Sequence, residues 1–173
     1  MIRYVLPPAL RVLAVRAAEA RAAAVLAAVV PSLALLAAVI APPALAALGG
    51  TEASVKADQR HLHATLSTAA TSRYTVHELA TPARSTVREY AAPSGVVFGV
   101  AWEGASYPDL RQLLGPYFQQ YADALAKRRT RRSPVTVTLP GLVVQAGGHM
   151  RAFTGKAWLP RELPAGVVSG DIR

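Results

Sequence analysis

The sequence predicts an α+β fold, in which an antiparallel sheet of about six strands (β-β-β-α-β-β-β) carries one long, kinked helix packed on a face. Segments in which apolar and polar residues alternate lie on both sides of one stretch with helical periodicity. Turn sequences rich in proline and glycine separate these segments. Because the connections are too short for parallel crossovers, neighbouring strands should run antiparallel.

Three strands are expected before the helix. Residues 74–79 and 85–90 alternate, and Thr-Pro-Ala-Arg at 81–84 forms a turn between them. A second turn, Pro-Ser-Gly at 93–95, leads into a third strand at 96–102. Their short connections predict a meander, in which each strand pairs with the next along the chain.

The periodicity changes after the third strand. An amphipathic helix is expected from Pro108 to Arg129, because proline suits a first helical turn and apolar residues then recur every three or four positions. Gly115-Pro116 falls in the middle and predicts a kink or two abutting helices. The apolar positions are Tyr107, Leu110, Leu113, Leu114, Tyr117, Phe118, Tyr121, Ala124 and Leu125.

Three more strands are expected after the helix, at 134–138, 142–145 and 149–159. Gly147-Gly148 is expected to form the hairpin turn into the last of them.

These elements place the folded domain at 73–160. Residues 47–72 are rich in Ala, Thr and Ser, and we expect them to be poorly ordered or to form a short helix. Residues 161–173 are expected to be a C-terminal tail.

Residues 1–46 have the pattern of a cleavable secretory signal. The apolar run Ala22–Ala41 ends at Pro42-Pro43 and at the small-residue site Ala44-Leu45-Ala46. The prolines end the helix, so a peptidase would cut between Ala46 and Ala47. The expected location is the periplasm. The alternative is an inner-membrane anchor, because about 20 uncharged residues can span a membrane. The basic residues ahead of the run are Arg3, Arg11, Arg16 and Arg21.

Charge and cysteine content narrow the possible functions. The chain has a formal net charge of +9 and no cysteine, which excludes disulfides and thiol chemistry. Positive charge gathers at 127–132, so a uniformly basic surface for nucleic acid is not indicated, and export argues against that partner too. This run is either a solvated helix end or a contact for an anionic envelope polymer or a partner protein. Its basic residues are Lys127, Arg128, Arg129, Arg131 and Arg132.

Several strings in the sequence are similar to those of exported bacterial proteins catalogued as domain of unknown function 2844. The resemblance covers essentially the whole chain after the leader and implies export and a small single domain. It brings no activity, cofactor or catalytic residue. The strings are Ala-Ala-Leu-Gly-Gly at 46–50, Thr-Val-Arg-Glu-Tyr at 86–90, Val-Phe-Gly-Val-Ala-Trp-Glu-Gly at 97–104, Pro-Asp-Leu-Arg-Gln-Leu-Leu-Gly at 108–115 and Gly-Gly-His-Met-Arg-Ala-Phe-Thr-Gly at 147–155.

One group of residues offers a candidate polar site. His149 and Arg151 lie two apart on a predicted strand, so both should point to one face, where Glu89 or Asp109 could complete an anion site or an acid/base pair. The alternative is a solvated hairpin face or a structural salt bridge.

No metal or cofactor is expected. The two histidines His61 and His63, together with Asp58, have loose metal-ligand character, but no third ligand follows at a suitable spacing. The sequence contains no Gly-x-Ser-x-Gly elbow, P-loop or dinucleotide-binding fingerprint.

We therefore expect an exported binding or structural accessory domain of the cell envelope rather than an enzyme. The alternative is a small envelope hydrolase or transferase centred on His149 and Arg151. An enzyme predicts that Glu89, Asp109, His149 and Arg151 converge in one pocket, and a binding module predicts that they lie apart. A third possibility is a membrane-anchored subunit that keeps the Ala22–Ala41 helix.

Overall fold

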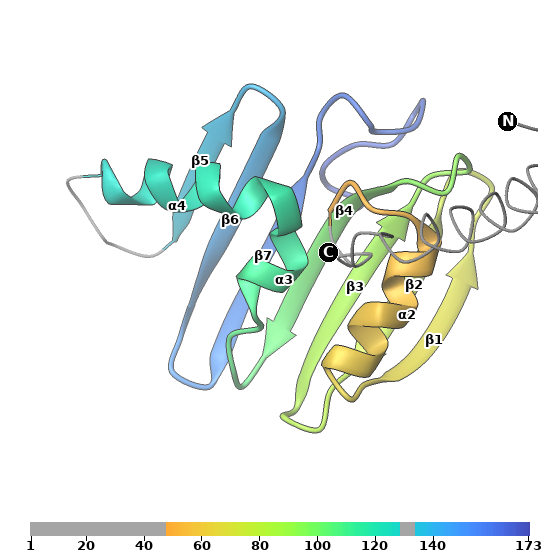
Figure 1. Ribbon diagram of the computed structural model, residues 1–173, viewed down its shortest axis with the longest axis horizontal. Coiled ribbons are helices and arrows are strands. Elements are labelled where there is room, and N and C mark those ends of the chain that lie inside the picture. Colours follow the sequence, from red (N-terminus) through yellow and green to blue (C-terminus); the bar gives the residue numbers. More distant parts are fainter. Residues whose placement is uncertain (1–47, 129–133) are drawn as a thin grey trace, which may run out of the picture. The chain divides into compact units, whose positions relative to one another are not determined.

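The computed structural model describes residues 48–128 and 134–173. Within them, seven strands form one antiparallel sheet in the order β1-β2-β3-β4-β7-β6-β5 (Figure 1). Strands β2 to β4 form the predicted three-stranded meander, and β1 adds a further strand beside β2. On the other side β7 pairs with β4, with Gly99 opposite Trp158. The strands are β1 (Thr65–Ala70), β2 (Thr75–Ala80), β3 (Ser85–Ala91), β4 (Val97–Gly104), β5 (Val135–Leu139), β6 (Leu142–His149) and β7 (Ala152–Trp158).

The helices pack against one face of this sheet, called here the helix face (Figure 1). Val55 of α2, Leu113 and Leu114 of α3 and Tyr121 of α4 are buried against the apolar side chains of the strands, which include Trp102. The helical elements are α2 (Glu52–His61), α3 (Leu110–Leu114), the 3-10 turn η1 (Gly115–Tyr117) and α4 (Phe118–Ala126).

The opposite face of the sheet is partly covered by the C-terminal residues 160–173 and is called here the tail face. Val167 and Ile172 are buried there against Tyr90, Phe98 and Trp158. The Cδ1 atom of Ile172 lies where a side chain on Gly99 would have to go. The segment expected to be a tail therefore forms part of a second core.

The predictions of about six strands and one long helix need correction. β1 is the additional strand, and it follows α2 within the segment expected to be poorly ordered or a short helix. Its residues, Thr-Leu-Ser-Thr-Ala-Ala, have no strong apolar alternation because an edge strand needs little burial. The helical stretch is split at Gly115-Pro116, where the interruption was expected, into α3, η1 and α4. It begins at Leu110 after Asp109 and ends at Ala126.

The β6–β7 turn also differs from the prediction. Gly147 and Gly148 lie inside β6, and the turn is made by Met150 and Arg151, with Arg151 at φ 65°. A side chain on Gly148 would collide with the backbone of β7, which explains why glycine occupies this strand position. Consequently His149 and Arg151 do not share a strand face.

Among residues 48–128 and 134–173, no helix is both long and apolar enough to cross a membrane. The leader residues 1–46, with the cleavage site Ala44, Ala46 and Ala47 and the Ala22–Ala41 run, lie outside the described residues.

Candidate functional site

An open groove runs along the tail face where β4 pairs with β7. Glu103 of β4 lies opposite Thr154 of β7, and both line two adjoining hollows of about 540 and 240 Å³. A third hollow, of about 430 Å³, also reaches Glu103 and continues past Arg88 to Arg173. The three hollows share lining residues and therefore form one continuous surface.

The groove is predominantly basic. Glu103 is the one acidic side chain among the described residues that line the hollows. Because basic side chains outnumber acidic ones in the groove, it should attract anions. The basic residues that line it are Arg84, Arg88, Arg151, Lys156 and Arg173.

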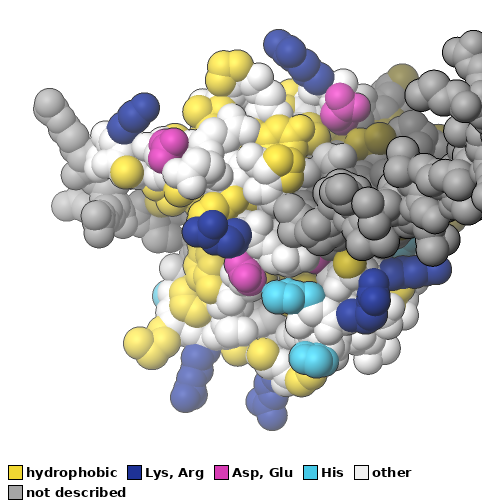
Figure 2. Space-filling model, viewed as in Figure 1, with side chains coloured by type: hydrophobic (Ala, Val, Ile, Leu, Met, Phe, Trp, Pro, Cys, Tyr) yellow, Lys and Arg dark blue, Asp and Glu magenta, His cyan; other side chains and the backbone are white. Residues whose placement is uncertain are grey.

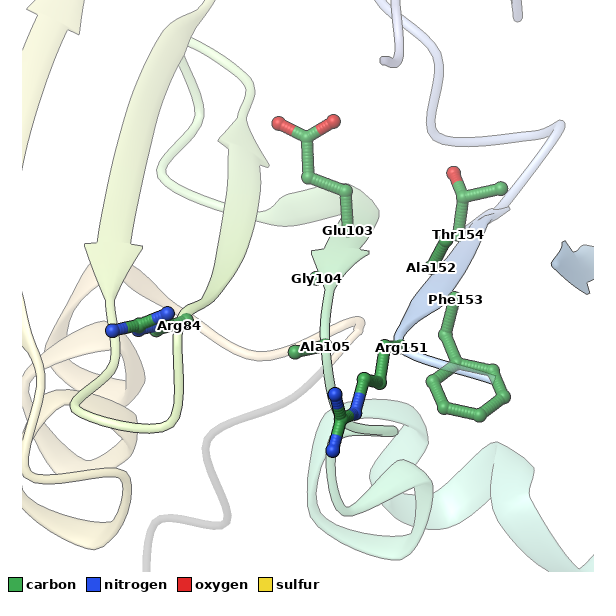
Figure 3. A pocket seen from close by; sticks show the side chains of 8 residues that line it. All are labelled: Arg84, Glu103, Gly104, Ala105, Arg151, Ala152, Phe153 and Thr154. Carbon is green, nitrogen blue, oxygen red and sulfur yellow. The ribbon is translucent and has the colours of Figure 1, made fainter. Parts of the chain in front are cut away.

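Two arginines stand at one end of the groove, on either side of the end of β4 (Figure 3). Arg84 comes from the β2–β3 turn and Arg151 from the β6–β7 turn, and sheet register brings these turns together, since Ser85 pairs with Gly104 and Gly104 with Phe153. Within the described chain, neither guanidinium makes a hydrogen bond or an ion pair with a protein group. Both are therefore available to a ligand.

The backbone conformation of these two turns fixes the points from which the two arginine side chains extend. Arg84 has φ 55° and Arg151 has φ 65°, a left-handed conformation that non-glycine residues adopt infrequently. The turn at Arg84 is tied down by two backbone bonds, from Arg84 N to Thr81 O at 3.2 Å and from Ala105 N to Arg84 O at 3.2 Å. The base of this side chain is thus held, while its guanidinium is exposed.

Arg88 organises the middle of the groove. Its Nε donates to Glu78 at 2.8 Å and its Nη2 donates to Glu103 at 2.7 Å. Burial acts to lower the pKa of Arg88, but the hydrogen bonds to these two carboxylates outweigh it and raise the pKa. Glu103 is therefore paired with Arg88 and turned away from Arg84 and Arg151 (Figure 3).

The C-terminal segment forms one wall of the groove. Lys156 Nζ donates to the carbonyl oxygens of Ser169 at 2.7 Å and Ile172 at 3.1 Å, and it lies 5.5 Å from the ring centre of Trp158. Tyr90 donates its hydroxyl proton to Arg173 O at 2.6 Å. These contacts hold the segment against β3 and β7.

A second polar cluster is buried beneath α2 on the helix face. Asp58 of α2 and Glu89 of β3 are both 0% exposed, and Gln112 of α3 donates to Asp58 Oδ1 at 2.8 Å. Next to Glu89 in the sheet, His77 has its Nδ1 3.1 Å from the Thr68 hydroxyl and its Nε2 3.8 Å from Glu52 Oε1. Burial, followed by the nearby charge of Asp58, raises the pKa of Glu89 to about 9. Burial also raises the pKa of Asp58.

This buried cluster has the chemistry of a structural contact. Glu89 carries a proton at neutral pH and can donate it to Asp58 Oδ2, which has no other hydrogen-bond partner among the described groups. None of the hollows along the tail face reaches either carboxyl group. The pair therefore joins α2 to the sheet rather than facing solvent.

The structure places the four predicted polar-site residues in different settings. Glu89 pairs with Val100, and Val100 pairs with Ala157, so Glu89 and Ala157 lie in one row across the sheet. Ala157 is six residues after Arg151, so Glu89 and Arg151 are separated by about 20 Å along the strand direction. Asp109 caps α3 by accepting from Arg111 N at 2.9 Å and Gln112 N at 3.3 Å. His149 is exposed, with Nδ1 3.3 Å from the carbonyl oxygen of Met150. Of the four, only Arg151 lines the groove.

The predicted basic run is only partly described. Lys127 is the C-cap residue that follows α4, and Arg128 donates to Thr136 O of β5 at 2.6 Å. Arg129, Arg131 and Arg132 lie outside the described residues. The described Lys and Arg side chains that are visible in Figure 2 are scattered rather than gathered in one patch.

Metal-ligand geometry does not occur in the described part of the chain, where no three His, Asp or Glu side chains gather to hold an ion. His61 lies 3.9 Å from Asp109, and this is a pair of half-exposed groups rather than a ligand set.

The other groove residues could not be singled out from the sequence. Arg84, Arg88, Glu103, Lys156 and Arg173 are far apart in the chain, and only the pairing of β4 with β7 brings them together. The available signal was modest: Arg84 precedes one predicted strand and Arg151 lies near the start of another, so both would lie at one end of the sheet if those strands ran in the same direction.

The fold and groove define a small α+β domain with an open, basic surface. The chain belongs to the family described as Protein of unknown function (DUF2844), whose model matches residues 44–172. This match confirms the family resemblance and assigns no activity. No curated protein and no solved structure matches the chain.

Proposed function

We propose that this protein is an exported binding module of the cell envelope, which holds an anionic polymer in the groove along β4 and β7. The observation that carries the proposal is the pair Arg84 and Arg151, two unpaired guanidinium groups on either side of the end of β4. Guanidinium groups bind carboxylates and phosphates through two parallel hydrogen bonds, so each can take one anionic group of a ligand.

The form of the groove favours a chain-like ligand over a small substrate. Three adjoining hollows extend from the hairpin turns to Arg173, and they share Glu103. A small-molecule site is usually a deep, mostly apolar cavity, whereas this surface is shallow, open and charged. An extended polymer with repeated negative charges can bridge successive basic residues along it.

The proposal of export rests on the leader. The basic residues, the apolar run Ala22–Ala41 and the Ala44-Leu45-Ala46 site together have the pattern of a secretory signal. Within the envelope, acidic polysaccharides and lipid headgroups are abundant anionic partners, and a basic groove suits them.

The binding proposal is tested by titrating the full chain with polygalacturonate, an acidic polysaccharide, and with neutral dextran. We expect polygalacturonate alone to bind, with an affinity that falls as salt rises. The R84Q/R151Q variant should bind roughly 30-fold more weakly, since each basic group near an anionic surface contributes about 1 kcal/mol. The control R60Q/R161Q removes two exposed arginines outside the groove and should bind like the wild type. Equal losses in both variants would contradict the proposal.

Export is tested by the intact mass and N-terminal sequence of the protein recovered from fractionated cells. We expect a periplasmic species that begins at Ala47. A membrane-bound species that retains Met1 would overturn cleavage and make the leader an anchor.

A further inference from the structure

The strand β1 is an unprotected edge of the sheet. It pairs with β2 on one side only, from Thr65–Ala80 to Ala70–Thr75, and five of its six residues are exposed. It contains no charged residue, proline or bulge, which are the features that usually keep an edge strand from pairing with another chain. In Figure 1 it is the outermost strand, beside α2.

The hydrogen-bond pattern between β1 and β2 shows which backbone groups of β1 point outward. Thr71 N donates to Tyr74 O at 2.8 Å, so this pair is a hydrogen-bonded one. Because hydrogen-bonded and non-bonded pairs alternate in an antiparallel ladder, Leu66, Thr68 and Ala70 turn their N–H and C=O groups away from β2. No group in the described chain bonds to these outward donors and acceptors.

The opposite edge of the sheet is protected. Arg128 Nη1 donates to the Thr136 carbonyl oxygen of β5 at 2.6 Å, and Pro134 and Pro140 stand just outside the two ends of this strand. A cation and flanking prolines discourage strand addition. In the described part of the chain, the sheet therefore has one edge that can pair and one that resists pairing.

We propose that two copies of this chain pair through β1, antiparallel about a two-fold axis, to form one continuous sheet. We choose a second copy as the partner because each copy has a single free edge. Pairing through one edge per copy closes the assembly at two copies, whereas two free edges per copy would build open chains. The absence of charge in β1 lets the strand face its own copy without like-charge repulsion.

The symmetry restricts the register of this pairing. Outward-facing residues must pair with each other. Of the registers that satisfy this rule, the two that overlap most of β1 place the two-fold axis at Thr68 and its copy or at Ser67 and its copy. The groove lies at β4 and β7, away from β1, and remains open in the dimer. This inference does not depend on the proposed ligand.

The chain has no cysteine, so single-cysteine variants report the pairing directly. We expect the full chain to have twice the monomer mass in light scattering, and S67C or T68C to form a disulfide-linked dimer on oxidation. The matched control T138C, at an exposed position of β5, should remain uncrosslinked. A monomeric mass, or crosslinking of T138C as fast as the β1 variants, would overturn the proposal.

A second pair of variants separates loss of pairing from loss of folding. S67K/A69K places like charges across the two-fold axis and should give a folded monomer, with the circular dichroism of the wild type. T136K/T138K adds the same charges to β5 and should remain dimeric. A dimer that persists in S67K/A69K would show that another surface forms it and would overturn the assignment to β1.

Discussion

The carboxyl groups of Asp58 and Glu89 lie against each other beneath α2, with both residues fully buried. Asp58 comes from the helix and Glu89 from strand β3, so the contact joins two residues that are 31 positions apart in the chain. Two buried carboxylates could not both be ionised at low cost, and one of them keeps a proton. The stability of the contact between α2 and the sheet therefore depends on pH.

Stability should decrease as pH rises. Glu89 has an ordinary pKa of 4.5 in the unfolded chain and a pKa of about 9 in the folded protein. Between these values the folded state binds more protons than the unfolded state, so the free energy of unfolding falls with rising pH. Urea denaturation at pH 5, 7 and 9 should show this decline. The isosteric variant E89Q should reduce the slope, while the control E162Q, at an exposed carboxylate, should retain it. A slope unchanged in E89Q would contradict this explanation.

Gly155 should be intolerant of any side chain. A Cβ at this position would overlap the ring of Trp102 and would lie 2.7 Å from the carbonyl oxygen of Gln145. We expect G155A to cost about 1–3 kcal/mol of stability, as overpacking does when backbone cannot move. G170A is the matched control, since its Cβ would make only an ordinary contact with Val168. Denaturation followed by tryptophan fluorescence measures both, and equal stabilities would be inconsistent with the close approach at Gly155.

Asp109 should act as a helix cap. Its side chain accepts from the first backbone amides of α3, and loss of such a cap typically costs about 1 kcal/mol. D109A should therefore lower the free energy of unfolding, and D109N should restore most of it because asparagine also caps helices. If D109N were as unstable as D109A, the carboxylate charge and its contact with His61 would be the more important feature.

The C-terminal segment should contribute to the stability of the domain. Ile172 is 0% exposed and packs on Gly99, so I172A should cost roughly 2–5 kcal/mol. V168A shortens a side chain that is 61% exposed in the same segment, and we expect it to change stability by less than about 0.5 kcal/mol. Thermal denaturation compares the two. An I172A variant as stable as V168A would show that this segment does not belong to the core.

Local patterns predicted the central elements well. Alternation at 74–79, 85–90 and 96–102 corresponds to β2, β3 and β4, and Gly115-Pro116 marks the break between α3 and α4. β1 was missed because an exposed edge strand has no buried face to impose alternation. The β6–β7 turn was misplaced because glycine there serves close packing between strands rather than chain reversal.

The groove depends on long-range pairing, which no local pattern encodes. Of the residues chosen from the sequence, Arg151 lies in it, but its partner Arg84 was assigned only to a turn. The two come together because β4 pairs with both β3 and β7. Glu89 was chosen as a candidate acid, yet its position on the inward side of β3 makes it a buried contact of α2.

The location of ligand binding tests the account most directly. Backbone amide chemical shifts can be followed by NMR while oligogalacturonate is added to the full chain. The groove predicts that the largest changes gather at residues 81–84, 103–105 and 151–154, which surround Arg84 and Arg151. Changes concentrated instead around Lys127 and Arg128, or none at any residue, would contradict the assignment of the groove as the binding surface.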